Sequence, residues 1–203
     1  MCRFIESIKL LDGEFKRLEF HQARIQKAFE AIYPNEKAFD LKDFLSKTSY
    51  PTEGIFKCRI VYDFEIRKIE FTPYVMRKIS SLKLLETQIE SSEFKLEDRR
   101  DYEIAFAQRG DCDDVLLVKN GLLTDSSYCN IALYDGKSWF TPRIPLLYGV
   151  NRADILKAGK VTEKDINANE LKDFQQITLF NAMIEFGEVV LDIDKYFRIL
   201  QTL

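Results

Sequence analysis

The sequence predicts an α+β fold in two parts, a small α+β domain over residues 1–85 and a larger β-rich domain over residues 86–203. The first is indicated by strand patterns on both sides of two helical patterns. The second is indicated by short apolar runs separated by the turn signals Asn120-Gly121 and Asp135-Gly136. A chain of 203 residues is long enough for two such domains.

The N-terminal elements follow from periodicity and turn chemistry. Residues 4–11 are half alternating, Asp12-Gly13 predicts a hairpin turn, and residues 14–18 predict a second short strand. Residues 20–32 carry apolar side chains at helical spacing. Tyr33-Pro34 ends this helix, because proline disfavours helical backbone in the residue before it.

A second helix is predicted at residues 41–47, and two strands follow at 54–64 and 66–75. Residues 77–94 are charged and have few turn signals, so we interpret them as the connection between the domains. Beyond it, a helix at 96–108 is expected. The remaining predicted elements are strands at 114–118, 122–124, 131–134, 138–141, 176–180 and 189–193 and a short helix at 152–159.

Composition narrows the class of protein. A net charge of −3 argues against a nucleic-acid-binding surface. Four scattered cysteines (Cys2, Cys58, Cys112, Cys129) and a single histidine, His21, predict no metal site and fit the reducing cytoplasm. No long apolar run begins the sequence, so we expect no signal peptide and no membrane span.

Three segments of the second half each join an apolar run to a polar turn. They are residues 124–130 (Thr-Asp-Ser-Ser-Tyr-Cys-Asn), 149–152 (Gly-Val-Asn-Arg) and 180–183 (Phe-Asn-Ala-Met). Upstream lie Lys95 and the segment 21–24 (His-Gln-Ala-Arg). In this order the set resembles the class IV (fold type IV) pyridoxal-phosphate enzymes. That family includes branched-chain and D-amino-acid aminotransferases and 4-amino-4-deoxychorismate lyase.

The resemblance implies that pyridoxal 5′-phosphate is the cofactor and that Lys95 forms the Schiff base with it. The amine must be neutral to attack a carbonyl, which burial or a nearby cation favours. Lys83 is the other candidate for the Schiff-base lysine by local sequence. It lies about a dozen residues upstream of the position that the family's spacing from the lysine to the strand at 114–118 requires. Taken alone, Lys95 would be interpreted as a surface residue opening the helix at 96–108.

Asp125 matches the family's glutamate, which faces the pyridine nitrogen, and Asn130 keeps the family's spacing of five residues. The aspartate is one methylene shorter, and an Asx-type turn is its ordinary interpretation. The resemblance implies that Arg24 binds the cofactor phosphate with its fork-shaped guanidinium. It also implies that the helix N-terminus at Val150 and Asn151 binds the same phosphate.

The resemblance also places Asn181 and Ala182 at the cofactor. The chain departs from the family pattern at Tyr62-Asp63, where relatives often have Arg-Gly on the substrate side. The segment 141–143 (Thr-Pro-Arg) and Asn181 favour 4-amino-4-deoxychorismate lyase, which releases pyruvate and leaves 4-aminobenzoate for folate biosynthesis.

Two other functions stay open at this point. One is an aminotransferase acting on branched-chain or D-amino acids, and the other is a catalytically inactive binding protein with the same fold. We expect a small-molecule amino substrate. The aromatic content of 16 Phe and 9 Tyr, together with the family resemblance, predicts a homodimer.

Overall fold

The structure is a computed structural model that describes residues 2–196. It divides into two compact units. The first contains the chain up to Met76 together with Ser92–Asp98, and the second contains Arg77–Ser91 and the chain from Arg99 onward. The sequence places a single boundary near residue 85, whereas in the structure the chain leaves the first unit at Met76 and returns to it for seven residues, 92–98.

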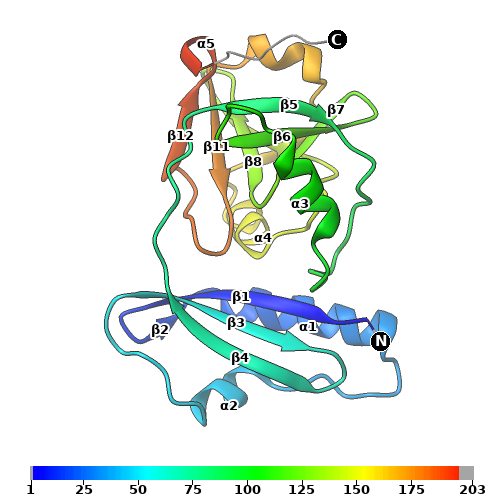
Figure 1. Ribbon diagram of the computed structural model, residues 1–203, viewed down its shortest axis with the longest axis vertical. Helices are drawn as coiled ribbons and strands as arrows, with labels where there is room; N and C mark the ends of the chain where they lie inside the picture. The colour runs from blue at the N-terminus through cyan, green and yellow to red at the C-terminus, as the bar shows by residue number, and fades with distance from the viewer. Residues whose placement is uncertain (1, 197–203) are drawn as a thin grey trace. The chain divides into compact units, whose positions relative to one another are not determined.

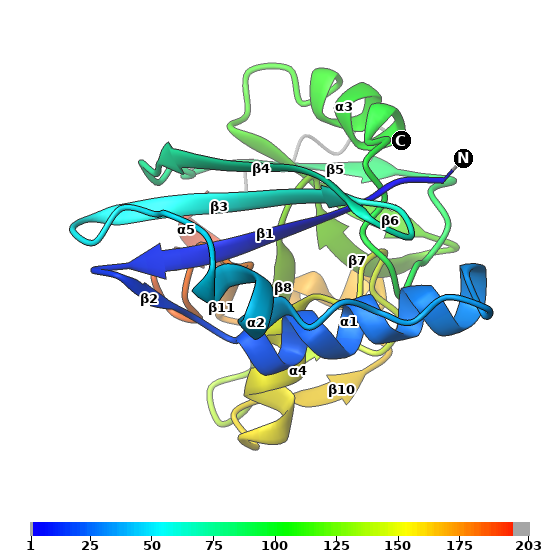
Figure 2. The same cartoon turned by 90° about the horizontal axis from the view of Figure 1, so that it is seen from below.

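The first unit is an antiparallel sheet with the strand order β2-β1-β3-β4 and two helices. Helix α1 lies along one face of the sheet (Figures 1 and 2). The predicted helices and strands of this region are confirmed, with ends shifted by a few residues. Its elements are β1 (Phe4–Leu11), β2 (Glu14–Phe15), α1 (Leu18–Ile32), α2 (Leu41–Ser46), β3 (Ile55–Tyr62) and β4 (Ile66–Pro73).

Alternation decides which side chains the sheet buries. Phe4 and Ile8 of β1 point toward α1, where Ile25 and Phe29 meet them in one apolar core. Side chains at the intervening positions of β1 therefore point to the opposite face, and Ser7 is among them. The face toward α1 buries the apolar core together with the carboxylate of Glu6, and the opposite face is more polar, with Ser7 and Lys9 of β1 on it.

The segment that carries Lys95 is attached to the first sheet by strand pairing. Leu96 pairs with Phe4 as an antiparallel bridge. The N–H of Ile5 donates to the carbonyl of Lys95 (2.8 Å), and the N–H of Glu97 donates to the carbonyl of Arg3 (2.9 Å). The prediction that a helix starts at residue 96 is therefore wrong for its first turn, because this backbone hydrogen-bonds with β1 instead.

The second unit is built on a longer mixed sheet with the order β10-β9-β8-β7-β6-β5, and β11 pairs with β8 and β12 (Figure 1). Strand β5 lies in the stretch that we interpreted as a connection, and it pairs in parallel with β6. The strands are β5 (Leu82–Glu86), β6 (Asp114–Lys119), β7 (Leu122–Ser126), β8 (Asn130–Tyr134), β9 (Trp139–Pro142), β10 (Thr162–Lys164), β11 (Gln176–Phe180) and β12 (Val189–Asp192).

Helices complete the second unit. They are α3 (Arg100–Ala107), α4 (Val150–Lys157), the short 3-10 helix η1 (Ala168–Asp173) and α5 (Ile193–Tyr196). Ile155 of α4 packs with Ala132 of β8 and Phe180 of β11, which holds α4 against the sheet. Within residues 2–196, no helix has the length and apolar character that crossing a membrane requires.

Candidate active site

Lys95 extends from the paired segment onto the polar face of the first sheet. Its Nζ donates to the hydroxyl of Ser7 on β1 (3.1 Å). The lysine is half-buried, and strand pairing holds the backbone on both sides of it. Sequence reasoning missed Ser7. Strand alternation puts Ser7 and Lys95 on one face only once the pairing of two segments far apart in the sequence is known.

The competing lysine has a different environment. Lys83 lies on β5 in the second unit, and its Nζ donates to the carbonyl of Gln108 just beyond α3 (2.9 Å). A lysine in that position interacts with the carbonyl end of a helix, as is common for surface cations. This contact gives Lys83 a structural role.

Arg24 and His21 of α1 meet the buried carboxylate of Glu6 on β1. Arg24 donates from Nε to Oε1 (2.9 Å) and from one Nη to Oε2 (2.5 Å), and Nδ1 of His21 lies 2.5 Å from Oε2. Burial raises the pKa of Glu6, but Arg24 and His21 outweigh it and lower that pKa to about 2. Burial also lowers the pKa of His21, so its neutral ring donates from Nδ1. Glu6 thus orients Arg24. Because a guanidinium has five N–H donors, Arg24 retains donors that can bind an anion.

Asp125 lies at the end of β7 and is almost completely buried. Its Oδ1 accepts from the side-chain amide of Asn130 (2.8 Å), and its Oδ2 accepts from the N–H of Leu147 (2.9 Å). Burial raises the pKa of Asp125 to about 6, although both hydrogen bonds act to lower it. The predicted spacing of five residues thus corresponds to a direct contact between Asp125 and Asn130 across the turn.

Asn130 also contacts the turn that leads into α4. Its amide donates to the carbonyl of Leu147 (2.8 Å). A Cβ at Gly149, the residue that caps α4, would lie 2.0 Å from Oδ1 of Asn130. Gly149 is therefore required here because a side chain would collide with Asn130. Through this contact, Asn130 connects the carboxylate of Asp125 to the N-terminus of α4.

The first turn of α4 is joined to the loop after β11 by two asparagines. Asn151, fully buried, donates to the carbonyls of Asn181 (2.8 Å) and Ile184 (3.0 Å). Asn181 in turn accepts from the N–H groups of Met183 (2.8 Å) and Ile184 (3.0 Å). Ala182 lies half-buried in this loop. The side chain of Asn151 thus holds two predicted phosphate-binding segments together.

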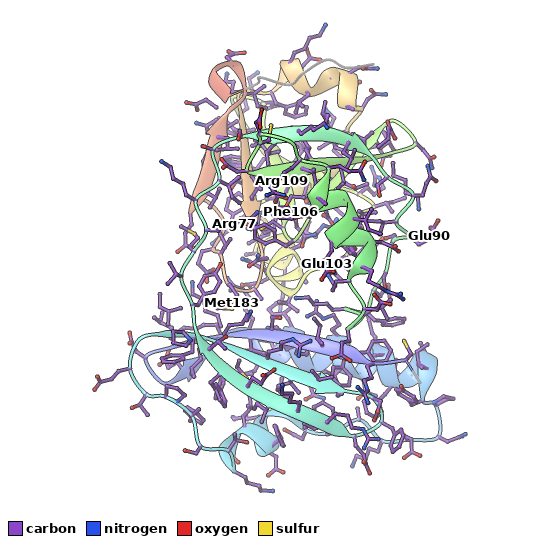
Figure 3. The ribbon with its side chains drawn as sticks, in the orientation of Figure 1. Arg77, Glu90, Glu103, Phe106, Arg109 and Met183 are labelled. Atoms are coloured by element: carbon purple, nitrogen blue, oxygen red, sulfur yellow. The ribbon has the colours of Figure 1, made fainter. Side chains whose placement is uncertain are left out.

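Stacked cations cover another part of the loop between β7 and β8. Arg77 lies over the rings of Tyr128 and Phe106, each 4.7 Å away, and Arg109 also lies over Phe106 at 4.0 Å (Figure 3). Cation–π contacts of this kind stabilise by about 0.5–1 kcal/mol when they are partly exposed. They tie Tyr128 of the loop to α3.

The first unit has a hollow of about 850 Å³ beside the neighbours of Lys95. Ion pairs line it: Arg67 with Asp63 (2.8 Å) and Arg3 with Glu97 (3.8 Å). Lys95 does not contribute to its lining. With Asp98 the lining holds two arginines and three carboxylates, which does not favour an anionic phosphate, so we do not assign the hollow to the active site.

The predicted residues fall into two sets, one in each unit. Lys95 and Arg24 belong to the first unit, and Asp125, Val150, Asn151, Asn181 and Ala182 belong to the second. The first unit offers an amine and a guanidinium, and the second offers a buried carboxylate and the first amides of α4, which have no partner within the helix. These are the types of group that a phosphate-bearing pyridine cofactor requires.

Known proteins resemble the chain over nearly its whole length. The family model described as amino-transferase class IV matches residues 3–191. An uncharacterised protein of Haemophilus influenzae is 32% identical over 187 residues, which cover 90% of this chain and 98% of that protein. The residues that the family model matches include every site residue named from the sequence.

Solved structures support the fold. A protein from Haemophilus somnus 129pt, described as a "putative 4-amino-4-deoxychorismate lyase", is 27% identical, with a TM-score of 0.85 over 91% of this chain and 98% of that chain. An aminotransferase from Brucella abortus bound to the cofactor PLP is 16% identical, with a TM-score of 0.74 over 94% of this chain and 79% of that chain. The predicted fold class is confirmed. The protein belongs to the class IV aminotransferases, the family of pyridoxal-phosphate-dependent enzymes that its motifs resemble.

Proposed function

We propose that the protein is a pyridoxal-phosphate-dependent 4-amino-4-deoxychorismate lyase that releases pyruvate and leaves 4-aminobenzoate. The observation that carries the proposal is the placement of Lys95. Its backbone is held by pairing with β1, and its amine contacts a hydroxyl on the same face of the sheet. The choice of a lyase is supported by the similarity to the protein from Haemophilus somnus 129pt.

Lys95 has two tasks in this reaction. It holds the cofactor until the substrate amine replaces it, and then it acts as a general base on the ring carbon that bears that amine. When bound, the cofactor supplies an electron sink conjugated to the substrate amine. The bond between the ring and the enolpyruvyl oxygen breaks, the ring becomes aromatic, and the proton that Lys95 removed ends on the departing pyruvate. Ser7, 3.1 Å from the amine, orients Lys95.

The other site residues bind and orient. Asp125 would hold the pyridine nitrogen of the cofactor, with Asn130 fixing the carboxylate. Arg24, oriented by Glu6, and the first amides of α4 would bind the phosphate, while Asn181 and Ala182 would hold the adjoining loop. Lys95 is thus the one residue with a role in bond breaking, and the rest position the cofactor.

An aminotransferase is the second candidate, favoured by the name of the family and by the neighbour from Brucella abortus. In that reaction Lys95 would move a proton from the substrate Cα to the cofactor. The free cysteines support a cytoplasmic location for either enzyme, because disulfides are rare in that compartment.

Pyruvate release from 4-amino-4-deoxychorismate tests the proposal. The assay is run beside a screen of amino-acid and keto-acid pairs, with Lys95→Ala as the inactive control. We expect stoichiometric pyruvate and 4-aminobenzoate from the wild type. Amino-group exchange without pyruvate would identify an aminotransferase, and neither activity in cofactor-loaded protein would identify a binding protein.

A further inference from the structure

We infer that Arg77 and Asp114 are positioning residues, which hold the loop 126–129 and thereby orient the carboxylate of Asp125. We call these two residues the loop anchor. Both act through other groups and contact neither substrate nor cofactor. The role of Asp125 at the pyridine nitrogen rests on the proposed function, whereas the loop anchor rests on contacts within the second unit.

The loop 126–129 connects two residues of the site and is closed on itself. Asp125 and Asn130 at its two ends are opposite each other in the pairing of β7 with β8. Within the loop, the N–H of Ser126 donates to the carbonyl of Cys129 (2.8 Å), and the hydroxyl of Ser126 accepts from the N–H of Cys129 (3.1 Å). A loop closed in this way carries its two ends with it when it shifts.

Both ends of the loop also bond to the turn before α4. Asp125 accepts from the N–H of Leu147 (2.9 Å), and the side-chain amide of Asn130 donates to the carbonyl of Leu147 (2.8 Å). The same amide donates to Asp125 (2.8 Å). A displaced loop would lengthen these hydrogen bonds, so the position of the loop decides the orientation of the Asp125 carboxylate.

Asp114 holds the loop from β6. It lies two residues before Leu116, which is opposite Ser126, so the antiparallel direction puts Asp114 beside the loop that follows Ser126. Its Oδ1 accepts from the hydroxyl of Ser127 (2.6 Å). The side chain is fully buried, and its Oδ2 has no hydrogen-bond partner among the described residues. Burial of an incompletely satisfied carboxylate costs free energy, so stability alone does not explain Asp114.

Arg77 holds the same loop through an aromatic ring. Its guanidinium lies 4.7 Å from the ring centres of Tyr128 in the loop and Phe106 in α3 (Figure 3). It also donates to the carbonyl of Asp113 (3.2 Å), and one Nη lies 3.9 Å from Oδ2 of Asp114. The two residues of the loop anchor thus contact adjacent residues of the loop and lie near each other.

Arg109 provides a matched control. It lies 4.0 Å from the ring of Phe106, the ring that Arg77 also contacts, and it donates to the carbonyl of Phe106 (3.2 Å; Figure 3). Among the described residues, it makes no hydrogen bond or ring contact with the loop. A change in the packing of α3 would therefore follow replacement of either arginine, whereas a change in the loop would follow replacement of Arg77 alone.

Hydrogen exchange of the Asn130 side-chain amide tests the inference. The exchange is followed by NMR on the full chain without cofactor, for the wild type, Arg77→Gln, Ser127→Ala and Tyr128→Phe, with Arg109→Gln as the control. Ser127→Ala removes only the hydroxyl that contacts the loop anchor, and Tyr128→Phe keeps the ring. Exchange of the backbone amides of β8 and β11 is recorded on the same samples to detect any general loss of stability.

We expect Arg77→Gln and Ser127→Ala each to speed exchange of the Asn130 amide about tenfold, without a matching change in β8 and β11. Tyr128→Phe and Arg109→Gln should exchange as the wild type does. An unchanged rate in both Arg77→Gln and Ser127→Ala would overturn the inference. Equal acceleration in Arg109→Gln, or acceleration shared by β8 and β11, would overturn it too. The measurement needs neither cofactor nor substrate, so a wild type without lyase activity would count against the proposed function alone.

Discussion

Asp125 is the residue whose surroundings most affect the proposed chemistry. As an aspartate in place of the family's glutamate, it has a shorter reach, and both of its oxygens accept hydrogen bonds from Asn130 and Leu147. Each oxygen retains a further lone pair, so the carboxylate can still accept from a pyridinium N–H. A carboxylate held this rigidly costs little reorganisation when charge develops on the ring.

Replacement of Asp125 should separate turnover from cofactor binding. We expect Asp125→Ala to lower kcat by several orders of magnitude, because the ring loses the charge that stabilises its protonated nitrogen. The phosphate contacts remain, so the protein should retain much of its cofactor by absorbance. Turnover within a few fold of the wild type would mean that Asp125 only shapes the turn.

The same carboxyl predicts how stability changes with pH. The ordinary value for an unfolded aspartate is 3.8, whereas the pKa of buried Asp125 is about 6. Between these values the unfolded state binds fewer protons, so the free energy of unfolding falls as the pH rises. Above about pH 6 the full loss corresponds to about 3 kcal/mol. Urea unfolding of wild type and Asp125→Asn should show a stability difference that changes across this window, and a constant difference would contradict the assignment.

At the scale of elements, the strands and helices defined by local signals are those that the sequence predicts. Helix α1 has a clear apolar stripe, and Pro34 marks its end. The sequence did not predict strand β5, because its pairing partner β6 begins only at Asp114. No local pattern in the sequence reveals a pairing between segments this far apart. The segment around Lys95 was misread as helix for the same reason, since its partner β1 lies about 90 residues earlier.

The site shows the same division between local and non-local information. Asn130 could be placed beside Asp125 from their spacing across one turn. The contacts of Arg24 with Glu6 and of Lys95 with Ser7 depend on neighbouring elements, which no local pattern reveals. The hydrogen bond from the side chain of Asn151 to the carbonyl of Asn181 likewise joins two segments 30 residues apart.

Gly149→Ala tests the contact between α4 and the turn after β7. The new Cβ would lie 2.0 Å from Oδ1 of Asn130, so Asn130 or the start of α4 must shift. We expect a loss of about 1–3 kcal/mol in thermal or urea unfolding, together with weaker retention of the cofactor. In the double variant Gly149→Ala/Asn130→Ala the added cost of Gly149→Ala should largely disappear. Additive effects would show that the collision is not the cause.

At the scale of the whole molecule, the chain passes between the two units three times, at Met76, Ser91 and Asp98. The short return, Ser92–Asp98, is what brings Lys95 to the first unit. Arg24 lies in the same unit, and the proposed ligands of the ring and of the adjoining loop lie in the other. The order of motifs along the chain is therefore more informative than any one of them.

We propose that the protein is a homodimer, which the family resemblance and the aromatic content predict. Exposed apolar side chains such as Ile104 and Ile144 of the second unit would gain from burial in a partner. Light scattering of cofactor-loaded protein at micromolar concentration should give twice the mass of one chain. The mass of a single chain across a dilution series would refute the dimer.

The attachment point of the cofactor is the central claim, and chemical trapping measures it directly. Cofactor-loaded protein is reduced with borohydride, which fixes the bond between lysine and cofactor, and the digested peptides are sequenced by mass spectrometry. Lys95→Ala and Lys83→Ala are treated in parallel. The proposal predicts a pyridoxyl group on Lys95 in the wild type and in Lys83→Ala, and none on Lys95→Ala protein. A label on Lys83, or a wild type that carries no label at all, would contradict it.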